Sequence, residues 1–206
     1  MAAVWIGPKI RASGKEGETK DSRREAGQSF QVKLSRPKLS QPRKTKRRKG
    51  MDLTWLTDRI AVGGGIWNAE NMAKVGEAGI THVIDMQLEF DDRPLAGASG
   101  IAVLWNPTDD DFEPKPAELF QCGVEFAEAA LGADGKLFIH CAAGVHRGPM
   151  MAAAVLSTMG WELKDAIALI ETRRPLADFP EVYVRSLEEF LSGRRFTAEN
   201  TEERGG

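Results

Sequence analysis

Cysteine is scarce in this 206-residue chain, which contains only Cys122 and Cys141. Two cysteines cannot form a disulfide framework, and they lack the paired spacing that a structural zinc site requires. The chain also lacks an apolar run of 18 residues and a secretory apolar segment near its start. We therefore expect no membrane span, no metal and no cofactor, and we predict a cytoplasmic protein.

Charge is divided unevenly along the chain. Residues 1–50 carry 15 Lys and Arg against 4 Asp and Glu, whereas the other 156 residues carry 13 against 26. The first segment has no sustained apolar period and is predicted to be disordered. Its basic run at 43–49 is interpreted as a solvated tail, although it could act as a nuclear address or contact acidic partners. The acidic remainder disfavours nucleic acid as a partner of the domain.

From Met51 onward, short β-like runs alternate with helical runs, which predicts an α/β fold. We expect a central, mainly parallel sheet of four to five strands flanked by helices, in one domain over residues 51–195 and followed by a disordered tail over 196–206. Asn68 is predicted to cap a helix that ends near Gly76 or Gly79. Cys122, in a helical run, is interpreted as a packing residue. The expected strands are two short ones within 53–65, then 80–86, 100–107 stopped by Pro107, and a central one at 136–140; the expected helices cover 116–131, 149–159, 162–173 and 181–192.

The segment HCAAGVHRGPM at 140–150 follows the predicted central strand and precedes a helix. Because Pro149 suits a first helical turn, the unpaired amides of the helix start and the preceding loop should form an anion site. Gly144 lets this loop bend, and its small neighbours Ala142 and Ala143 leave the amides uncovered. Arg147 can hold two oxygens of a phosphoryl group.

The same dipoles and the arginine favour a thiolate at Cys141, because such settings lower a cysteine pKa. A thiolate beside a bound phosphate implies phosphoryl transfer. The alternative is a structural cysteine and arginine at the end of a strand, since the spacing by itself is a weak signal.

His140, Cys141 and Arg147 fit the His-Cys-x5-Arg signature, so residues 53–192 resemble the cysteine-dependent protein tyrosine phosphatases, in particular the small dual-specificity members. The resemblance implies a phosphocysteine at Cys141 and equatorial oxygens bound by Arg147 and the loop amides. It also implies an aspartate on a separate mobile loop that protonates the leaving oxygen. The implied substrate-binding loop contains Ala142, Ala143, Gly144, Val145 and His146.

The run NPTDDDFEPKP at 106–116 offers three candidates for this acid. Small dual-specificity members have Asp-Phe-x-Pro about thirty residues before the cysteine, and this pattern selects Asp111. Asp110 is the second choice and Asp109 the third. At least one of these acids is expected to serve only a solvated turn or a helix cap.

Gly148 departs from the family pattern, in which a Ser or Thr hydroxyl assists the second, hydrolytic step. Turnover could therefore be slow, and a phosphate-binding pseudophosphatase or scaffold is the alternative function. His140 is expected to support the loop and the thiolate, whereas His146 is either a substrate-facing or an exposed loop residue.

A phosphoprotein substrate is favoured, with phosphotyrosine included and phosphoserine or phosphothreonine open. Lipid headgroups are disfavoured because the loop carries Ala142, Ala143 and Val145 instead of lysines, on an acidic domain. A sulfur-transferring or arsenate-reducing enzyme is a weaker alternative, because reduction needs a resolving cysteine. The sequence leaves the oligomeric state open.

Overall fold

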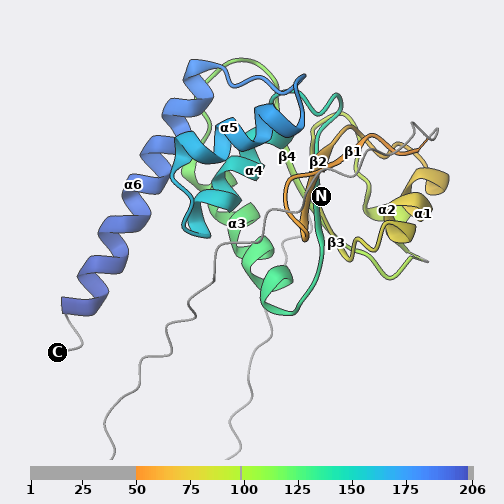
Figure 1. Ribbon diagram of the computed structural model, residues 1–206, viewed down its shortest axis with the longest axis horizontal. Helices are drawn as coiled ribbons and strands as arrows, with labels where there is room; N and C mark the ends of the chain where they lie inside the picture. Colours follow the sequence, from red (N-terminus) through yellow and green to blue (C-terminus); the bar gives the residue numbers. More distant parts are fainter. Residues whose placement is uncertain (1–49, 98, 204–206) are drawn as a thin grey trace, which may run out of the picture. The chain divides into compact units, whose positions relative to one another are not determined.

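Figure 1 shows the computed structural model of the chain, which describes residues 50–97 and 99–203, with side chains up to Arg194. The predicted disorder of residues 1–49 lies outside the described residues. Among the helices of the described part, none is long and apolar enough to cross a membrane.

A five-stranded sheet forms the centre of the fold, in the order β1-β2-β5-β3-β4. Only β1 is antiparallel to its neighbour, and the other pairs are parallel. The predicted central strand β5 lies in the middle, and all four of its residues are buried. The predicted fold class is therefore confirmed. The strands are β1 (Leu53–Trp55), β2 (Ile60–Gly63), β3 (His82–Gln87), β4 (Ala102–Thr108) and β5 (Leu137–His140).

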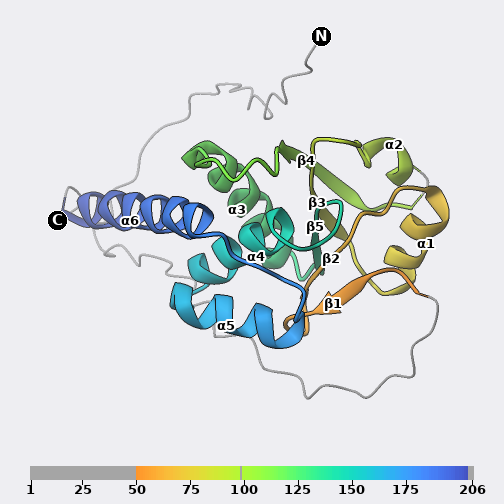
Figure 2. The ribbon, with the colours of Figure 1, turned by 90° about the horizontal axis from the view of Figure 1, so that it is seen from above.

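Helices cover both faces of the sheet, with α1 and α2 on one side and α3 to α6 on the other (Figure 2). Alternate residues of the strands point to opposite faces, so Phe138 packs in the core beside α1 while Leu137 and Ile139 pack in the core beside α4. The helices are α1 (Ala69–Glu77), α2 (Arg93–Ala96), α3 (Ala117–Gly132), α4 (Arg147–Thr158), α5 (Leu163–Arg173) and α6 (Glu181–Glu203).

Several helix boundaries follow the sequence, and others differ from it. The side chain of Asn68 caps α1 as predicted, accepting a hydrogen bond of 2.9 Å from the amide of Asn71. The short α2 was not predicted. Helix α4 begins at Arg147, two residues before Pro149, and α6 continues to Glu203 although a disordered tail was predicted from residue 196. Propagation of an existing helix adds one hydrogen bond per ordered residue, and no proline follows to stop it.

Strand β4 runs through Pro107 to Thr108 and does not stop at the proline as predicted. The strand lies at the sheet edge, and its register with β3 shifts between Asp85 and Gln87. An edge position next to a register irregularity tolerates a residue without an amide hydrogen.

The interpretation of Cys122 as a packing residue is wrong, because the residue is exposed. Its neighbours Phe120, Gly123 and Val124 face the core, which places Cys122 on the outer face of α3. Partial burial, assisted by Glu125, raises the pKa of its thiol. Cys141, in contrast, is buried.

Candidate active site

The loop between β5 and α4, residues 141–146, is called the signature loop. The carbonyl oxygens of residues 142–145 all accept hydrogen bonds from outside it. Their donors are the amides of Gly65 and Asp178 and the guanidinium of Arg174, at 2.7–3.2 Å. In a trans peptide the carbonyl and the following N–H point in opposite directions. The amides of residues 143–146 are therefore turned to the inner side of the loop, where they can bind an anion.

Gly144 is required by the shape of this loop. Its φ is +65°, a conformation that L side chains rarely adopt. A Cβ at this position would also collide with the guanidinium of Arg174 and the backbone of Gly63. The role predicted for Gly144, a bend that other residues avoid, agrees with this geometry.

Arg174 supports the outer side of the signature loop, and sequence reasoning missed it. Its side chain is 2% exposed and pairs through both terminal nitrogens with the carboxylate of Asp52, at 2.8 and 2.7 Å. The hydrogen bond from Arg174 holds the pKa of Asp52 below its usual value. Because 122 positions separate the two residues, no local sequence pattern indicates the pair.

Cys141 directly follows β5, is 1% exposed and belongs to the main core. Gly148, in the first turn of α4, allows the helix to approach this point closely. A Cβ on Gly148 would lie 3.2 Å from backbone atoms of both His140 and Cys141. The glycine at the position after the arginine therefore also has a packing role.

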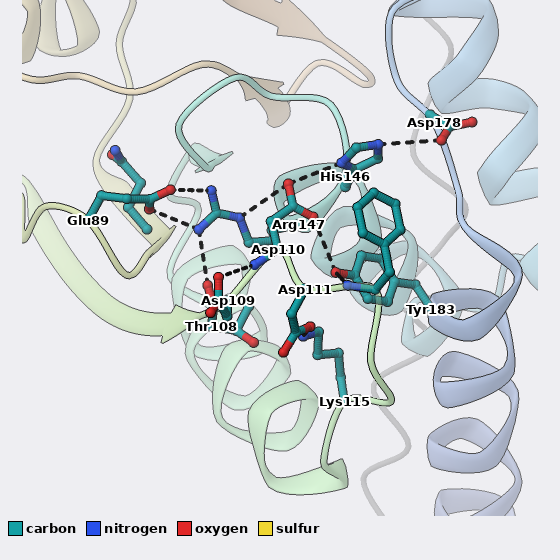
Figure 3. A network of polar contacts seen from close by, with 12 residues as sticks. Glu89, Thr108, Asp109, Asp110, Asp111, Lys115, His146, Arg147, Asp178 and Tyr183 are labelled. Atoms are coloured by element: carbon teal, nitrogen blue, oxygen red, sulfur yellow. Dashed lines mark hydrogen bonds and ion pairs between the residues drawn. The ribbon is translucent and has the colours of Figure 1, made fainter.

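Arg147 is 3% exposed and is held in a fixed orientation (Figure 3). Its two terminal nitrogens donate to the carboxylate of Glu89 at 2.9 and 2.8 Å, and Nη1 also donates to the carbonyl of Thr108 at 3.0 Å. Its Nε is buried and has no hydrogen-bond partner. The edge formed by Nε and the second hydrogen of Nη2 can thus receive two oxygens of one ligand.

Glu89 and Arg147 stabilise each other's charge. The hydrogen bond from Arg147 lowers the pKa of Glu89 to about 2. Burial by itself lowers the pKa of Arg147, but the hydrogen bond to Glu89 and the charges of Cys141 and Asp110 raise it overall. Both groups therefore stay ionised at neutral pH. Nothing in the sequence distinguishes Glu89 from the other acids that follow β3.

The three consecutive aspartates after β4 point in different directions (Figure 3). Asp110 faces the signature loop, with its Oδ2 3.1 Å from Nδ1 of His146 and 3.8 Å from Nε of Arg147. Asp111 instead pairs with Lys115 and accepts the amide of Glu113 at 3.0 Å. The hydrogen bond from Lys115 lowers the pKa of Asp111.

Asp109, the third candidate, is exposed and accepts the amide hydrogen of Asp110 at 2.8 Å. It therefore serves a local turn. Asp110, the second choice from sequence, is the aspartate that the structure brings to Arg147.

Tyr183 of α6 fixes the loop that carries these acids. Its hydroxyl donates to Oδ1 of Asp110 at 3.2 Å and accepts the amide of Phe112 at 3.1 Å. Burial first, and the nearby Asp110 second, raise the pKa of Tyr183 to about 12. The hydroxyl consequently remains a donor throughout the neutral range.

His146 lies between two carboxylates, because its Nε2 is also 3.4 Å from Asp178. Its side chain is 19% exposed, so it is neither a freely exposed loop residue nor buried. This position places it beside Asp110 at the entrance to the signature loop.

His140 belongs to a fully buried group with Asp85 and Asp92. Its Nε2 lies 3.0 Å from Asp92, and its ring stacks on Phe138 at 5.1 Å. Asp85 accepts the amides of Gln87 and Asp92, and burial raises the pKa of Asp85 to about 6.

These three side chains are the described residues that could best hold a metal ion, with ligand atoms within 4.8 Å of one another. Nε2 of His140 and Oδ2 of Asp92 lie 3.0 Å apart, but neither buried atom makes a hydrogen bond. His140 directly precedes Cys141 in the chain, and its role in supporting the loop and the thiolate stays a prediction.

Comparison with known proteins identifies the family of this chain. The sequence model of the dual specificity phosphatase catalytic domain matches residues 66–192. The tyrosine-protein phosphatase vhp-1 of Caenorhabditis elegans is 27% identical over 143 residues, which cover 69% of this chain and 20% of the relative. Human dual specificity protein phosphatase 15 is 26% identical over 130 residues, covering 62% of this chain and 42% of the relative. The chain thus spans less than half the length of both relatives.

Solved structures share the fold. The structure of PTPMT1 in complex with PI(5)P matches with a TM-score of 0.64 and 21% identity, covering 71% of this chain and 99% of that chain. Human DUSP28 matches with a TM-score of 0.61 and 21% identity, covering 70% and 95%. Because the family match covers more than half of the chain, the protein belongs to the dual specificity phosphatase catalytic domain family.

Proposed function

We propose that this protein is a phosphatase that hydrolyses phosphate monoesters on proteins, with phosphotyrosine among its substrates. The observation that carries the proposal is the Nε of Arg147, which is buried beside the signature loop and makes no hydrogen bond. This edge of the guanidinium, the inward amides of the signature loop and Cys141 belong to the continuous segment 141–147, and Oδ2 of Asp110 lies 3.8 Å from Nε of Arg147. This arrangement provides a nucleophile, an anion cradle and a proton donor in one place.

In the first step, the sulfur of Cys141 attacks phosphorus and a sulfur–phosphorus bond forms as the ester P–O bond breaks. Asp110 donates its proton to the leaving oxygen, while Arg147 and the loop amides bind the equatorial oxygens. In the second step, water attacks phosphorus and Asp110 takes the proton of that water. The sulfur–phosphorus bond then breaks and inorganic phosphate is released.

Asp110 takes the acid role in this proposal, in place of the Asp111 favoured by the sequence pattern. Its carboxylate lies beside Arg147, whereas Asp111 is paired with Lys115 and has a lowered pKa. A carboxyl group with a lowered pKa is ionised at neutral pH and therefore has no proton to donate.

A second candidate function is that of a phosphate-binding pseudophosphatase with poor turnover. Gly148 favours it, because no hydroxyl stands there to assist release of the thiolate in the second step. The cradle itself would be unaffected, since it is built from backbone amides and Arg147.

Hydrolysis of an aryl phosphate without added metal tests the proposal. Wild-type protein should release phosphate over many turnovers, vanadate should block the reaction, and Cys141→Ser should abolish it. Cys122→Ser is the matched control, because Cys122 is exposed on the outer face of α3. A single burst of one product per protein, without further turnover, would favour the pseudophosphatase. Activity that survives in Cys141→Ser would refute both candidates.

A further inference from the structure

In the part of the chain whose side chains are described, the exposed large apolar residues lie on connections near the signature loop and Arg147. Over residues 50–97 and 99–194, the exposed large hydrophobic residues are Trp67, Leu88, Phe112 and Leu176, with exposures of 45–55%. Single exposed apolar residues are common on protein surfaces. Here three come from segments that contact the signature loop and Leu88 comes from the segment that contacts Arg147, and we call these four residues the apolar rim.

Two members of the apolar rim lie on the β2–α1 and β3–α2 connections. The ring of Trp67 packs over Gly65, whose amide donates to the carbonyl of Ala142 at 3.0 Å. Leu88 directly precedes Glu89, the partner of Arg147.

The other two members lie on the β4–α3 and α5–α6 connections. Phe112 packs edge-on against His146, with ring centroids 5.3 Å apart. Leu176 lies two residues before Asp178, whose amide donates to the carbonyl of Val145 at 2.9 Å. Each of the four lies on a separate connection that also carries a residue in contact with the signature loop or with Arg147.

Backbone strain marks two of the four positions independently. Trp67 and Phe112 have φ values of 66° and 59°, and Asp134 is the one other non-glycine residue with positive φ in the described part of the chain. Bulky side chains rarely adopt this conformation, and strained residues concentrate at functional sites. Trp67 packs on Phe90 at 5.9 Å and Phe112 stacks on Tyr183 at 6.1 Å, yet the two residues stay 45% and 55% exposed.

The surroundings of the apolar rim are acidic. Residues 108–115 carry four acids and one lysine, and Asp109 is exposed. Glu113 is exposed, and Asp178 keeps 69% of its side chain in solvent. Such a field attracts cationic groups and repels anionic ones.

We propose that the apolar rim and its acidic border select phosphoprotein segments in which apolar and basic residues flank the phosphorylated residue. This inference rests on the proposed function and adds the substrate class. Apolar flanking side chains would cover Trp67, Leu88, Phe112 or Leu176, while Lys or Arg farther out would face Glu113 and Asp178. An anionic membrane surface fits the apolar side chains but is repelled by the acids.

Three phosphotyrosyl peptides of equal length test the inference, with flanks of apolar residues and Lys, of the same apolar residues and Glu, or of Gly, Ser and Lys. For each, kcat/KM is divided by that for para-nitrophenyl phosphate on the same preparation, which cancels general losses of activity. We expect the first peptide to exceed the other two by about tenfold. Equal ratios would overturn the inference, as would faster hydrolysis of phosphatidylinositol phosphate in vesicles.

Variants locate the preference on the surface. Trp67→Asn should reduce the advantage of apolar flanks, and asparagine is chosen because it tolerates the positive φ of this position. Glu113→Lys should reduce the advantage of Lys flanks over Glu flanks. Glu77→Lys, an exposed charge change at the end of α1, is the matched control and should leave both ratios unchanged. A change in Glu77→Lys as large as in Glu113→Lys would contradict a local role for the rim.

Binding of the same peptides to Cys141→Ser separates this inference from the proposed function. A binding preference for apolar and basic flanks supports the apolar rim even if wild-type protein hydrolyses nothing. Equal binding of the three peptides overturns the rim even if para-nitrophenyl phosphate is hydrolysed rapidly.

Discussion

At the residue scale, the direction of a side chain decides its role more than its chemical type does. Arg147 uses Glu89 and the carbonyl of Thr108 to fix its guanidinium, and this leaves one edge for a ligand. Asp110 and Asp111 are chemically identical neighbours, but only Asp110 faces that edge.

The two aspartates give the first prediction. Asp110→Asn should lower kcat by about a hundredfold on phosphate esters with poor leaving groups, because proton donation contributes this much. It should also flatten the alkaline limb of the pH profile, since the rate no longer depends on a protonated acid. The loss should be small for activated aryl phosphates.

Asp111→Asn is the matched control for Asp110→Asn. Loss of the Asp111 carboxylate should leave the pH profile unchanged, because Asp111 contacts Lys115 and not Arg147. If Asp111→Asn flattened the alkaline limb and Asp110→Asn did not, the assignment of the acid would be reversed.

Gly148 gives the second prediction. A serine there adds a hydroxyl near Cys141, but its Cβ must fit 3.2 Å from backbone atoms of His140 and Cys141. We expect Gly148→Ser to accelerate the steady-state rate while leaving the first, thiol-phosphorylating burst nearly unchanged. Rapid-mixing measurements separate the two steps.

Gly148→Ala separates crowding from the effect of the hydroxyl. The alanine carries the same Cβ and should not accelerate the steady-state rate. A serine variant no faster than alanine would show that the hydroxyl has no role in this protein.

At the scale of elements, distant helices and strands hold the two loops of the site in place. Helix α6 holds the acid loop through Tyr183, whose hydroxyl contacts both Asp110 and the amide of Phe112. The segment after α5 holds the signature loop through Arg174, which Asp52 at the start of β1 anchors in turn.

The contact between α6 and the acid loop gives the third prediction. Tyr183→Phe removes the hydrogen bond to Asp110 and the one from the amide of Phe112, and a bond of this kind contributes about 1 kcal/mol. The expected loss in kcat is about fivefold, with little change in KM, because Asp110 does not bind the ground-state phosphate in this proposal. A loss confined to KM would show that Tyr183 acts on substrate binding instead.

Combination with the acid variant tests whether Tyr183 acts through Asp110. In Asp110→Asn, the further change Tyr183→Phe should have almost no effect on kcat. Additive losses in the double variant would show that the two residues act independently.

At the scale of the whole molecule, the site is built on a buried charge that costs stability. Asp85 lies in the middle of the sheet, 0% exposed, and burial raises its pKa to about 6 from 3.8. Between pH 3.8 and about pH 6, Asp85 therefore keeps its proton in the folded protein and has lost it in the unfolded chain. This stabilisation is complete below about pH 4 and is lost as the pH rises through about 6.

The fourth prediction follows from that sign. Between pH 4 and pH 7.5 the Asp85 contribution to the free energy of unfolding should fall by up to about 3 kcal/mol, the equivalent of a shift of two pKa units. Denaturant unfolding at several pH values measures it. In Asp85→Asn the dependence over this range should be shallower than in wild-type protein, and identical slopes would contradict the assignment.

Sequence by itself determined the order of strands and helices along the chain, apart from the short α2, and the central position of β5. It also determined the signature loop, because Cys141, Gly144 and Arg147 lie on one short connection whose geometry follows from a strand, a glycine and a helix start. These features depend on neighbours along the chain, whose spacing is visible in the printed sequence.

Only the tertiary structure decided which of three adjacent aspartates faces the loop, and which distant residues support it. Glu89 contacts Arg147 across 58 positions, and Arg174 contacts Gly144 across 30 positions. Tyr183 contacts Asp110 across 73 positions. Such contacts depend on how helices pack on the sheet, and the same local pattern is compatible with many packings. The physical reason is that periodicity fixes which face of an element is buried, whereas the partner of that face is fixed by the fold.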